Sequence, residues 1–213
     1  MEIKLKIYGE SACFVSGGGR QWCDQLEAAL TTRPPSDFLE SVRGHDNLLL
    51  IFNSPSGLDG IKQWLARLPA VKSIPIATGR KIKLAVCYNG PDLKQVAAWA
   101  GLSQSAVIDL HTAVEYRVRL IGFMPGFPYL DGLDPRLHFA RRASPRNYIP
   151  AGSVAIGGAH AGIYSVGSPG GWHLLGQTQQ PLLMLQHSQA ARIDPAKIFA
   201  LNPGDRVRFV PVD

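Results

Sequence analysis

The chain has 213 residues, of which 46% are hydrophobic and 18% charged, as expected of a folded protein with one large or two small cores. Its longest purely apolar runs, such as residues 48–52, are far shorter than the roughly 20 residues that a membrane helix needs. The formal net charge of +6 is dispersed along the chain, with no recognisable nucleic-acid motif. We therefore expect neither a membrane nor a nucleic acid as partner.

The amino-terminal residues and the cysteines indicate the compartment. Residues 1–7 alternate apolar and charged side chains like a strand and lack the apolar core of a signal peptide, which predicts a cytoplasmic location. Cys13, Cys23 and Cys87 have no CxxC spacing. They are therefore expected to be reduced, without a disulfide framework or a zinc site.

The first third of the chain predicts a small α+β domain. Strands are expected at residues 3–7, 12–15 and 48–52, where apolar residues alternate or form a short run. Apolar residues at helical spacing predict helices at 20–30 and 58–68, each followed by proline. With a closing strand at 71–76, this order suits a sheet with both helices on one face. We place this first domain at residues 1–79.

The second domain, residues 80–213, is predicted to be a compact β-barrel. A strand at 81–88 precedes a helix at 93–100 that Gly101 can terminate, and Ser103 can cap a further helix that ends near residue 113. Beyond residue 115 the strand signals are short and separated by turns, as in barrels. These strands are expected at 116–120, 153–156, 163–166, 172–176 and 206–210.

Four clusters of glycine, proline, aromatic and arginine residues follow one another between residues 121 and 178. They occupy residues 122–130, 141–146, 149–154 and 168–172. Glycine permits positive φ and close backbone approach, while proline fixes φ, so the chain makes repeated shaped turns here. Turns of this kind build pockets.

The order of these clusters closely resembles the allophanate hydrolase subunit 1 family. The matching motifs are His111-x4-Tyr116, Gly122 to Leu130, Pro150 to Val154, Gly162-Ile-Tyr164, Ser168 to Trp172 and Pro203 to Phe209. With the turn at residues 9–12 and the segment 86–93, the resemblance covers nearly the whole chain. The chain departs from the family at two places: His160-Ala161 replaces an expected Gln-Thr pair, and Ser165 replaces a proline.

The resemblance implies a fold, an activity and partners. The fold would be α+β, with a ferredoxin-like amino-terminal domain and a cyclophilin-like barrel. The activity would be that of one component of ATP-dependent 5-oxoprolinase, which opens the lactam of 5-oxoproline to glutamate while ATP is hydrolysed. Its partners would be a companion of the allophanate hydrolase subunit 2 type and a companion of the LamB/YcsF type. Inhibition of a histidine kinase by docking, or a part in urea or allophanate metabolism, are alternatives that the sequence leaves open.

ATP is expected as a co-substrate, although the chain has no GxxxxGK[ST] motif. A nucleotide site must therefore be unconventional or shared with a partner protein. The anionic groups of such a reaction suit arginine, whose planar fork pairs with carboxylate and phosphate, and Arg142 and Arg146 are our candidates. An ion pair that braces a loop is the alternative for both.

The remaining candidates lie on the turns and in the predicted helices. Gly170 and Gly171 can present backbone N–H groups to an anion or simply form a hairpin turn. His111, at a predicted helix end, is the candidate general acid or base, or else a core histidine bonded to a backbone carbonyl. Phe123, Phe127, Tyr129 and Trp172 either wall a pocket or fill the barrel.

The last candidates are one serine and two histidines in the barrel domain. Ser153 is a candidate substrate contact in the turn after Pro150, but it has no GxSxG context that would support a hydrolase triad. His160 and His173 lie in the turn-rich region without a third ligand at suitable spacing, so no metal site is expected.

Overall fold

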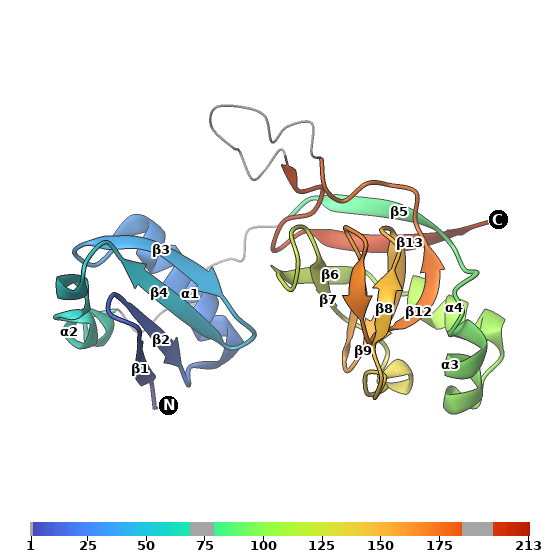
Figure 1. Cartoon of the computed structure of the whole chain (residues 1–213), viewed down its shortest axis with the longest axis horizontal. Helices are drawn as coiled ribbons and strands as arrows, with labels where there is room; N and C mark the ends of the chain where they lie inside the picture. Colours follow the sequence, from blue (N-terminus) through green and yellow to red (C-terminus); the bar gives the residue numbers. More distant parts are fainter. Residues whose placement is uncertain (1, 69–78, 185–197) are drawn as a thin grey trace. The chain divides into compact units, whose positions relative to one another are not determined.

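The computed structural model describes residues 2–68, 79–184 and 198–213 (Figure 1). The chain divides into two compact units, Met1–Ile76 and Ala77–Asp213. The predicted closing strand at 71–76 lies outside the described residues, so the domain limits of 1–79 and 80–213 stay a prediction. In the described part of the chain, no helix is both long enough and apolar enough to span a bilayer.

The first unit is a four-stranded antiparallel sheet, in the order β1-β2-β4-β3, with two helices. Its elements are β1 (Lys4–Tyr8), β2 (Ala12–Ser16), α1 (Gly19–Thr32), β3 (Phe38–Arg43), β4 (Asn47–Phe52), a 3-10 turn η1 (Pro55–Leu58) and α2 (Ile61–Ala66). Strand β3 was not predicted, because its Phe-Leu-Glu-Ser-Val-Arg sequence has no clear alternation and a register shift interrupts its pairing with β4. The ferredoxin-like assignment stays a prediction.

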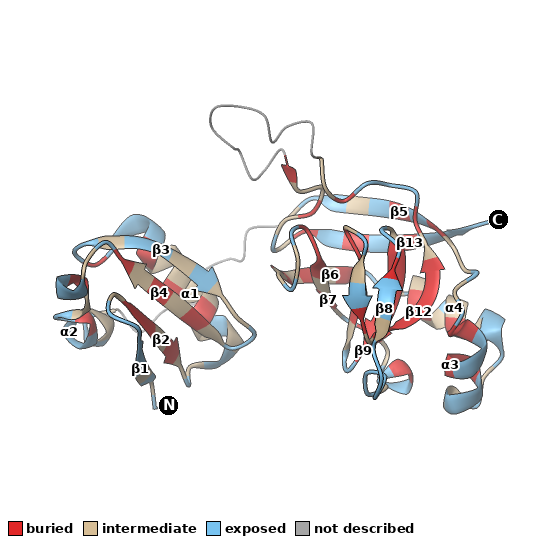
Figure 2. Ribbon diagram, viewed as in Figure 1, coloured by how far each residue is buried: buried red, intermediate tan, exposed pale blue. Residues whose placement is uncertain are grey.

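The core of this unit lies between the sheet and α1. Leu26 and Leu30 of the helix pack with the alternate residues of β2 and β4 that face them. Figure 2 shows the buried segments of β2 and β4 in red. Hydrophobic burial on one face of each element therefore holds the unit together. The three cysteines are free; Cys13 and Cys23 are buried in this core, and Cys87 of the second unit is partly exposed.

The second unit is built on a closed barrel of seven strands, in the order β10-β7-β6-β13-β5-β12-β9. Its elements are β5 (Lys81–Cys87), α3 (Leu93–Ala100), α4 (Gln104–Thr112), β6 (Tyr116–Ile121), β7 (Pro128–Asp131), a 3-10 turn η2 (Pro135–Leu137), β8 (Arg146–Ile149), β9 (Ser153–Gly157), β10 (His160–Ile163), β11 (Ser168–Gly170), β12 (His173–Gln177) and β13 (Arg206–Val212). The predicted mixture of helices with a β-barrel is thus confirmed. The finer cyclophilin-like assignment stays a prediction.

Two local signals determine where α3 ends and where α4 begins. Gly101 follows α3 in the left-handed region, with φ of 65°, and ends the helix as predicted. The hydroxyl of Ser103 accepts a hydrogen bond of 3.1 Å from the backbone N–H of Ala106 and so caps α4.

The first and last strands of the unit, β5 and β13, pair in parallel, from Lys81 opposite Arg206 to Cys87 opposite Val212. Next to this pair, the buried carboxylate of Asp205 accepts hydrogen bonds from the backbone N–H of Arg80, at 2.9 Å, and from its guanidinium, at 2.6 Å. Contacts between the first and last strands of the unit, which are far apart in sequence, therefore close the barrel.

The strands on the glycine-rich side differ from the prediction. The expected strand at 163–166 lies earlier, at β10, because Gly158 adopts a positive φ of 61° and allows a tight turn directly after β9. Strands β7, β8 and β11 were not predicted, since they are short and contain or adjoin proline and glycine. Of these, β8 and β11 form a separate two-stranded sheet, in which Arg146 lies opposite Gly170.

Candidate functional site

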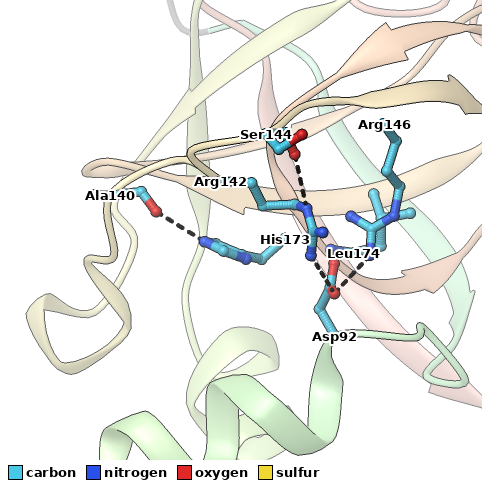
Figure 3. A network of polar contacts seen from close by, with 7 residues as sticks. All are labelled: Asp92, Ala140, Arg142, Ser144, Arg146, His173 and Leu174. Carbon is cyan, nitrogen blue, oxygen red and sulfur yellow. Dashed lines mark hydrogen bonds and ion pairs between the residues drawn. The ribbon is translucent and has the colours of Figure 1, made fainter.

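Asp92 connects α3 to the glycine-rich side of the barrel. It occupies the N-cap position of α3 but its side chain does not cap the helix. Its carboxylate turns toward the barrel instead, where Oδ2 accepts a hydrogen bond of 2.7 Å from the backbone N–H of Leu174 in β12. The other oxygen, Oδ1, faces the arginines that follow η2. Figure 3 shows this arrangement.

Arg142 and Arg146 both pair with Asp92. Nη2 of Arg146 donates to Oδ1 at 2.7 Å, while Nη1 of Arg142 lies 3.5 Å from the same oxygen (Figure 3). Burial acts to raise the pKa of Asp92, but the hydrogen bonds from Arg146 and Leu174 and the two positive charges lower it overall. One carboxylate therefore faces two guanidinium groups, and the cluster keeps an excess positive charge.

The backbone around this cluster is held by short contacts. The N–H of Arg142 donates to the carbonyl of Gly171 at 2.7 Å, which ties the arginine turn to the Gly170–Gly171 pair. Nearby, Nε2 of His173 lies 2.8 Å from the carbonyl oxygen of Ala140 (Figure 3). The ring of Trp99 packs edge-on against the imidazole. The structure thus brings Arg142, Arg146 and the glycine pair together, and both arginines form an ion pair with Asp92, as the alternative in the sequence analysis expected. Their binding of an anion stays a prediction.

The aromatic residues that were predicted to line a pocket pack on one another. The ring centroid of Phe127 lies 5.1 Å from that of Tyr129 and 5.4 Å from that of Trp172. Phe127 and Trp172 are buried, whereas Tyr129 is partly exposed. Phe127 and Trp172 belong to a buried cluster with Ile149 of β8 and Tyr164, and only Tyr129 of the three rings is partly exposed.

Ser153 and Gly170 lie against Tyr164, a fully buried residue just after β10. The carbonyl of Ser153 accepts a hydrogen bond of 2.9 Å from the backbone N–H of Tyr164. A side chain at Gly170 would overlap the hydroxyl of Tyr164, so the close packing requires glycine there. A Cβ at Gly171 would meet only ordinary contacts, the nearest being the carbonyl oxygen of Arg142 at 3.4 Å.

His111 lies in a different environment from the arginines. It is 0% exposed, its Nδ1 is 2.7 Å from the hydroxyl of Tyr88, and its ring stacks on Phe209 at 4.6 Å between centroids. Burial lowers its pKa to about 3, so it is neutral at physiological pH. None of its described contacts is with the Asp92 cluster, and its acid–base role stays a prediction.

The two departures from the family pattern have structural consequences. Nδ1 of His160 lies 3.1 Å from Oδ1 of Asp131, and Arg119 is 3.6 Å from the same oxygen. The hydroxyl of Ser165 donates a hydrogen bond of 2.6 Å to the carbonyl of Pro125. Proline has no group that could make this contact, so Ser165 adds a tether to the loop that contains Phe123 and Phe127.

Asp92 and Tyr164 were not predicted as site residues. Asp92 was visible only as part of a matching segment, far in sequence from its arginine partners, and Tyr164 only as part of Gly162-Ile-Tyr164. Phe123, a predicted pocket residue, adopts a positive φ of 68° and is 63% exposed. Among the described residues, no three His, Cys, Asp or Glu side chains are grouped to hold a metal ion.

Comparison with known proteins identifies the class of domain. Residues 3–193 match the family model described as "Carboxyltransferase domain, subdomain C and D". The chain belongs to this family, and the resemblance to the allophanate hydrolase subunit 1 family is thereby confirmed.

Individual relatives add detail. The chain is 41% identical over 181 residues to a protein named as the B subunit of 5-oxoprolinase from Escherichia coli O157:H7, covering 81% of this chain and 78% of the relative. It is 32% identical over 115 residues to the urea amidolyase of Saccharomyces cerevisiae, covering 53% of this chain and 6% of that protein.

A solved structure shows the same fold at similar identity. The crystal structure of TTHA0988 has a TM-score of 0.75 and 35% identity, and the alignment covers 95% of this chain. This chain spans only 40% of the TTHA0988 chain.

Proposed function

We propose that this chain is the B subunit of an ATP-dependent 5-oxoprolinase, in which it contributes to opening 5-oxoproline to L-glutamate. The observation that carries the proposal is the 41% identity to the Escherichia coli protein of that name over most of both chains. The positively charged cluster of Arg142 and Arg146 supports it, because both the substrate and the phosphate of ATP are anionic. Opening the lactam as a cytoplasmic reaction fits the reduced cysteines expected from the sequence.

The chemistry explains why arginine suits this site. A lactam is stabilised by amide resonance, and phosphorylation of its oxygen by ATP, which leaves as ADP, would make the ring carbon electrophilic. Water would then add to that carbon, the C–N bond would break as the nitrogen takes up a proton, and hydrolysis of the resulting acyl phosphate would yield glutamate and phosphate. Such a site must hold carboxylate and phosphate groups close together, and fixed guanidinium donors favour that arrangement. Arg146 is already fixed by Asp92, so it would bind without first being ordered.

We further propose that the chain acts only with two partners. One is the C subunit of the enzyme, of the allophanate hydrolase subunit 2 type, and the other is its A subunit, of the LamB/YcsF type. ATP would bind at a site that a partner shares or supplies, because the chain has no phosphate-binding loop motif. The greater length of TTHA0988 supports an arrangement in which a domain like this one works beside further protein.

A second candidate is a part in urea or allophanate chemistry. The match to yeast urea amidolyase favours it, although that alignment covers only 53% of this chain. Urea, allophanate and 5-oxoproline all present an amide group, so a related barrel could serve each. The kinase-inhibitor alternative would need docking on a histidine kinase and stays a prediction from the family resemblance.

The test is reconstitution with purified partners. We expect the isolated chain to be inactive and the complex of all three proteins to release glutamate from 5-oxoproline with ATP. Turnover of allophanate or urea in place of 5-oxoproline would favour the second candidate. Robust 5-oxoproline hydrolysis by the chain alone, or failure to co-elute with the C subunit, would contradict the proposed complex.

The arginine contact is tested in the same assay. Arg146→Ala removes a desolvated charge-assisted contact. We expect it to raise the activation free energy calculated from kcat/KM by about 2–5 kcal/mol. Arg136→Ala is the matched control, since Arg136 pairs with Asp134 on the surface, where such pairs contribute little. Equal activity of the two folded variants would exclude Arg146 from the site.

A further inference from the structure

Two buried hydrogen-bond donors near the Asp92 cluster, Nη1 of Arg146 and the hydroxyl of Tyr164, have no acceptor among the described residues. Nδ1 of His173 is a third buried polar atom there without a partner in the described part of the chain. Buried polar groups in native proteins are nearly always paired, so each exception calls for an explanation. Arg146 and Tyr164 both lie next to Gly170, which makes a common explanation for these two donors the simplest.

The backbone places these atoms together. Arg146 in β8 pairs directly with Gly170 in β11, and the space beside the Cα of Gly170 is filled by the Tyr164 hydroxyl. Side chains of directly paired residues point to the same face of a sheet. The Arg146 side chain therefore extends over the face on which the Tyr164 hydroxyl lies.

Both atoms are hydrogen-bond donors. A guanidinium nitrogen can only donate, and its charge is permanent. Burial raises the pKa of Tyr164, and the nearby Trp172 backbone N–H, Arg146 and Arg141 offset only part of that rise. The hydroxyl is therefore protonated at neutral pH, and its hydrogen has no acceptor in the described part of the chain. Two adjacent donors, one of them charged, suit a single oxygen acceptor.

The loop that carries Phe123 lies against Tyr164. The ring of Phe123 lies 6.4 Å from that of Tyr164 and 5.6 Å from that of Phe127, between centroids, yet Phe123 itself is 63% exposed. Tyr164 is thus one ring away from the surface. The positive φ of Phe123 is unfavourable for a bulky residue, and such strain concentrates at ligand-binding sites.

We propose that Nη1 of Arg146 and the hydroxyl of Tyr164 together bind an acyl oxygen of the substrate, beneath the loop that carries Phe123. This assignment rests on the proposed function for its substrate, 5-oxoproline, and it adds Tyr164 as a binding residue. The oxygen is either that of the lactam carbonyl or one of the carboxylate. Both are acceptors that complete the two empty donor positions, and the experiments below distinguish them.

Tyr164→Phe gives a sharp test because it removes only the hydroxyl. A hydroxyl that serves the fold stabilises it, whereas one that waits for a ligand costs stability in the free protein. We expect Tyr164→Phe to keep or raise the Tm of the purified chain and to lower kcat/KM of the assembled complex about 100-fold. Tyr116→Phe is the matched control: Tyr116 is equally buried, but its hydroxyl donates to the carbonyl of His111 at 3.0 Å. That variant should lower Tm and leave kcat/KM unchanged.

A binding experiment distinguishes failure of this inference from failure of the proposed function. The wild-type complex and its Tyr164→Phe variant are titrated calorimetrically with 5-oxoproline, with 2-pyrrolidone, which keeps the lactam, and with proline, which keeps the carboxylate. Weaker binding of pyrrolidone to the variant assigns the lactam oxygen, and weaker binding of proline assigns the carboxylate. Absence of 5-oxoproline turnover with intact, Tyr164-dependent binding would contradict the proposed function alone.

The inference itself is overturned by any of three results. These are a Tm for Tyr164→Phe that falls as far as that of Tyr116→Phe, unchanged kcat/KM in Tyr164→Phe, or equal binding of every probe by the wild type and the variant. Arg146→Lys provides the second variant: it keeps a positive charge but loses the fork, and it should weaken binding of the same probe as Tyr164→Phe.

Discussion

Two buried polar regions of the barrel unit each contain a nitrogen without a hydrogen-bond partner among the described residues: Nη1 of Arg146 and Nε2 of His111. Around His111 the neighbours are aromatic and the imidazole is kept neutral by burial. Around Arg146 the groups are charged, and a carboxylate already uses one side of the guanidinium.

The difference is one of charge. A neutral ring nitrogen can lie unpaired against aromatic rings at moderate cost, because the proton that would charge it is simply not bound. A guanidinium cannot give up its charge in this way, so an unpaired N–H on it is more costly. Burial alone therefore does not distinguish a site from a core, whereas an unpaired donor of permanent charge does.

The largest expected effect is in the charged region. Asp92→Asn leaves Arg142 and Arg146 without their counter-charge, and we expect the free energy of unfolding to fall by about 3 kcal/mol. Because the pKa of Asp92 is lowered in the folded state, its contribution is present above its unfolded pKa and is lost as pH falls through the folded value. Denaturant curves of both proteins at neutral and acidic pH check this, and a constant difference at all pH values would contradict it.

The next effect concerns packing at the same region. In Gly170→Ala the new methyl group would lie 2.8 Å from ring carbons of Tyr164, and relieving that overlap should cost about 2 kcal/mol. Gly171→Ala is the control, since its methyl group has room, and its Tm should stay within a degree or so of the wild type, about the scatter of a neutral substitution. Equal Tm values for the two variants would show that the predicted overlap is relieved without cost.

A pH effect is expected in the neutral region. The pKa of His111 falls from its ordinary value of 6.5 to about 3 on folding, so the unfolded chain binds the extra proton between those values. Stability is then lost as pH falls from 6.5 toward 3, by up to about 1.4 kcal/mol per pH unit. His111→Gln, which does not titrate, should show a shallower dependence by that amount. Identical slopes for both proteins would mean that His111 is not buried as described.

The smallest effect is the loss of one neutral hydrogen bond. Tyr88→Phe removes the hydroxyl that lies 2.7 Å from Nδ1 of His111, and we expect about 1 kcal/mol of destabilisation by thermal unfolding. The contrast with Asp92→Asn would measure how much more a charged contact contributes than a neutral one. A loss as large as that of Asp92→Asn would remove the distinction between the two regions.

Local signals in the sequence predicted much of the second unit. Gly101 and Ser103 ended and began helices where expected, because helix caps depend on one or two residues. Strand β3 was missed, because its pairing with β4 is decided by tertiary contacts and not by alternation within the strand itself. The position of β10 was missed for a related reason, since the turn at Gly158 fixes it.

The candidate site was predicted only in part. Arg142, Arg146 and the glycine pair were chosen because they lie on recognisable turns, and the structure places them near one another, while their role in binding stays a prediction. Asp92 is separated from Arg146 by 54 positions, so no spacing rule could pair them. Tyr164 could not be chosen over other buried tyrosines, because what distinguishes it is the absence of an acceptor, which depends on the whole fold.

The parallel pairing of β5 with β13 determines when this unit can fold during synthesis. Arg80 and Asp205, which meet at one end of that pair, are 125 positions apart. Contacts of such long sequence separation are slow to form, and they cannot form before both strands have left the ribosome. The strand that closes the barrel is the last of its seven to be translated. Until then, the edges of β5 and β6 that β13 will cover have no partner strand, and an unpaired edge of this kind is a template for pairing with another chain.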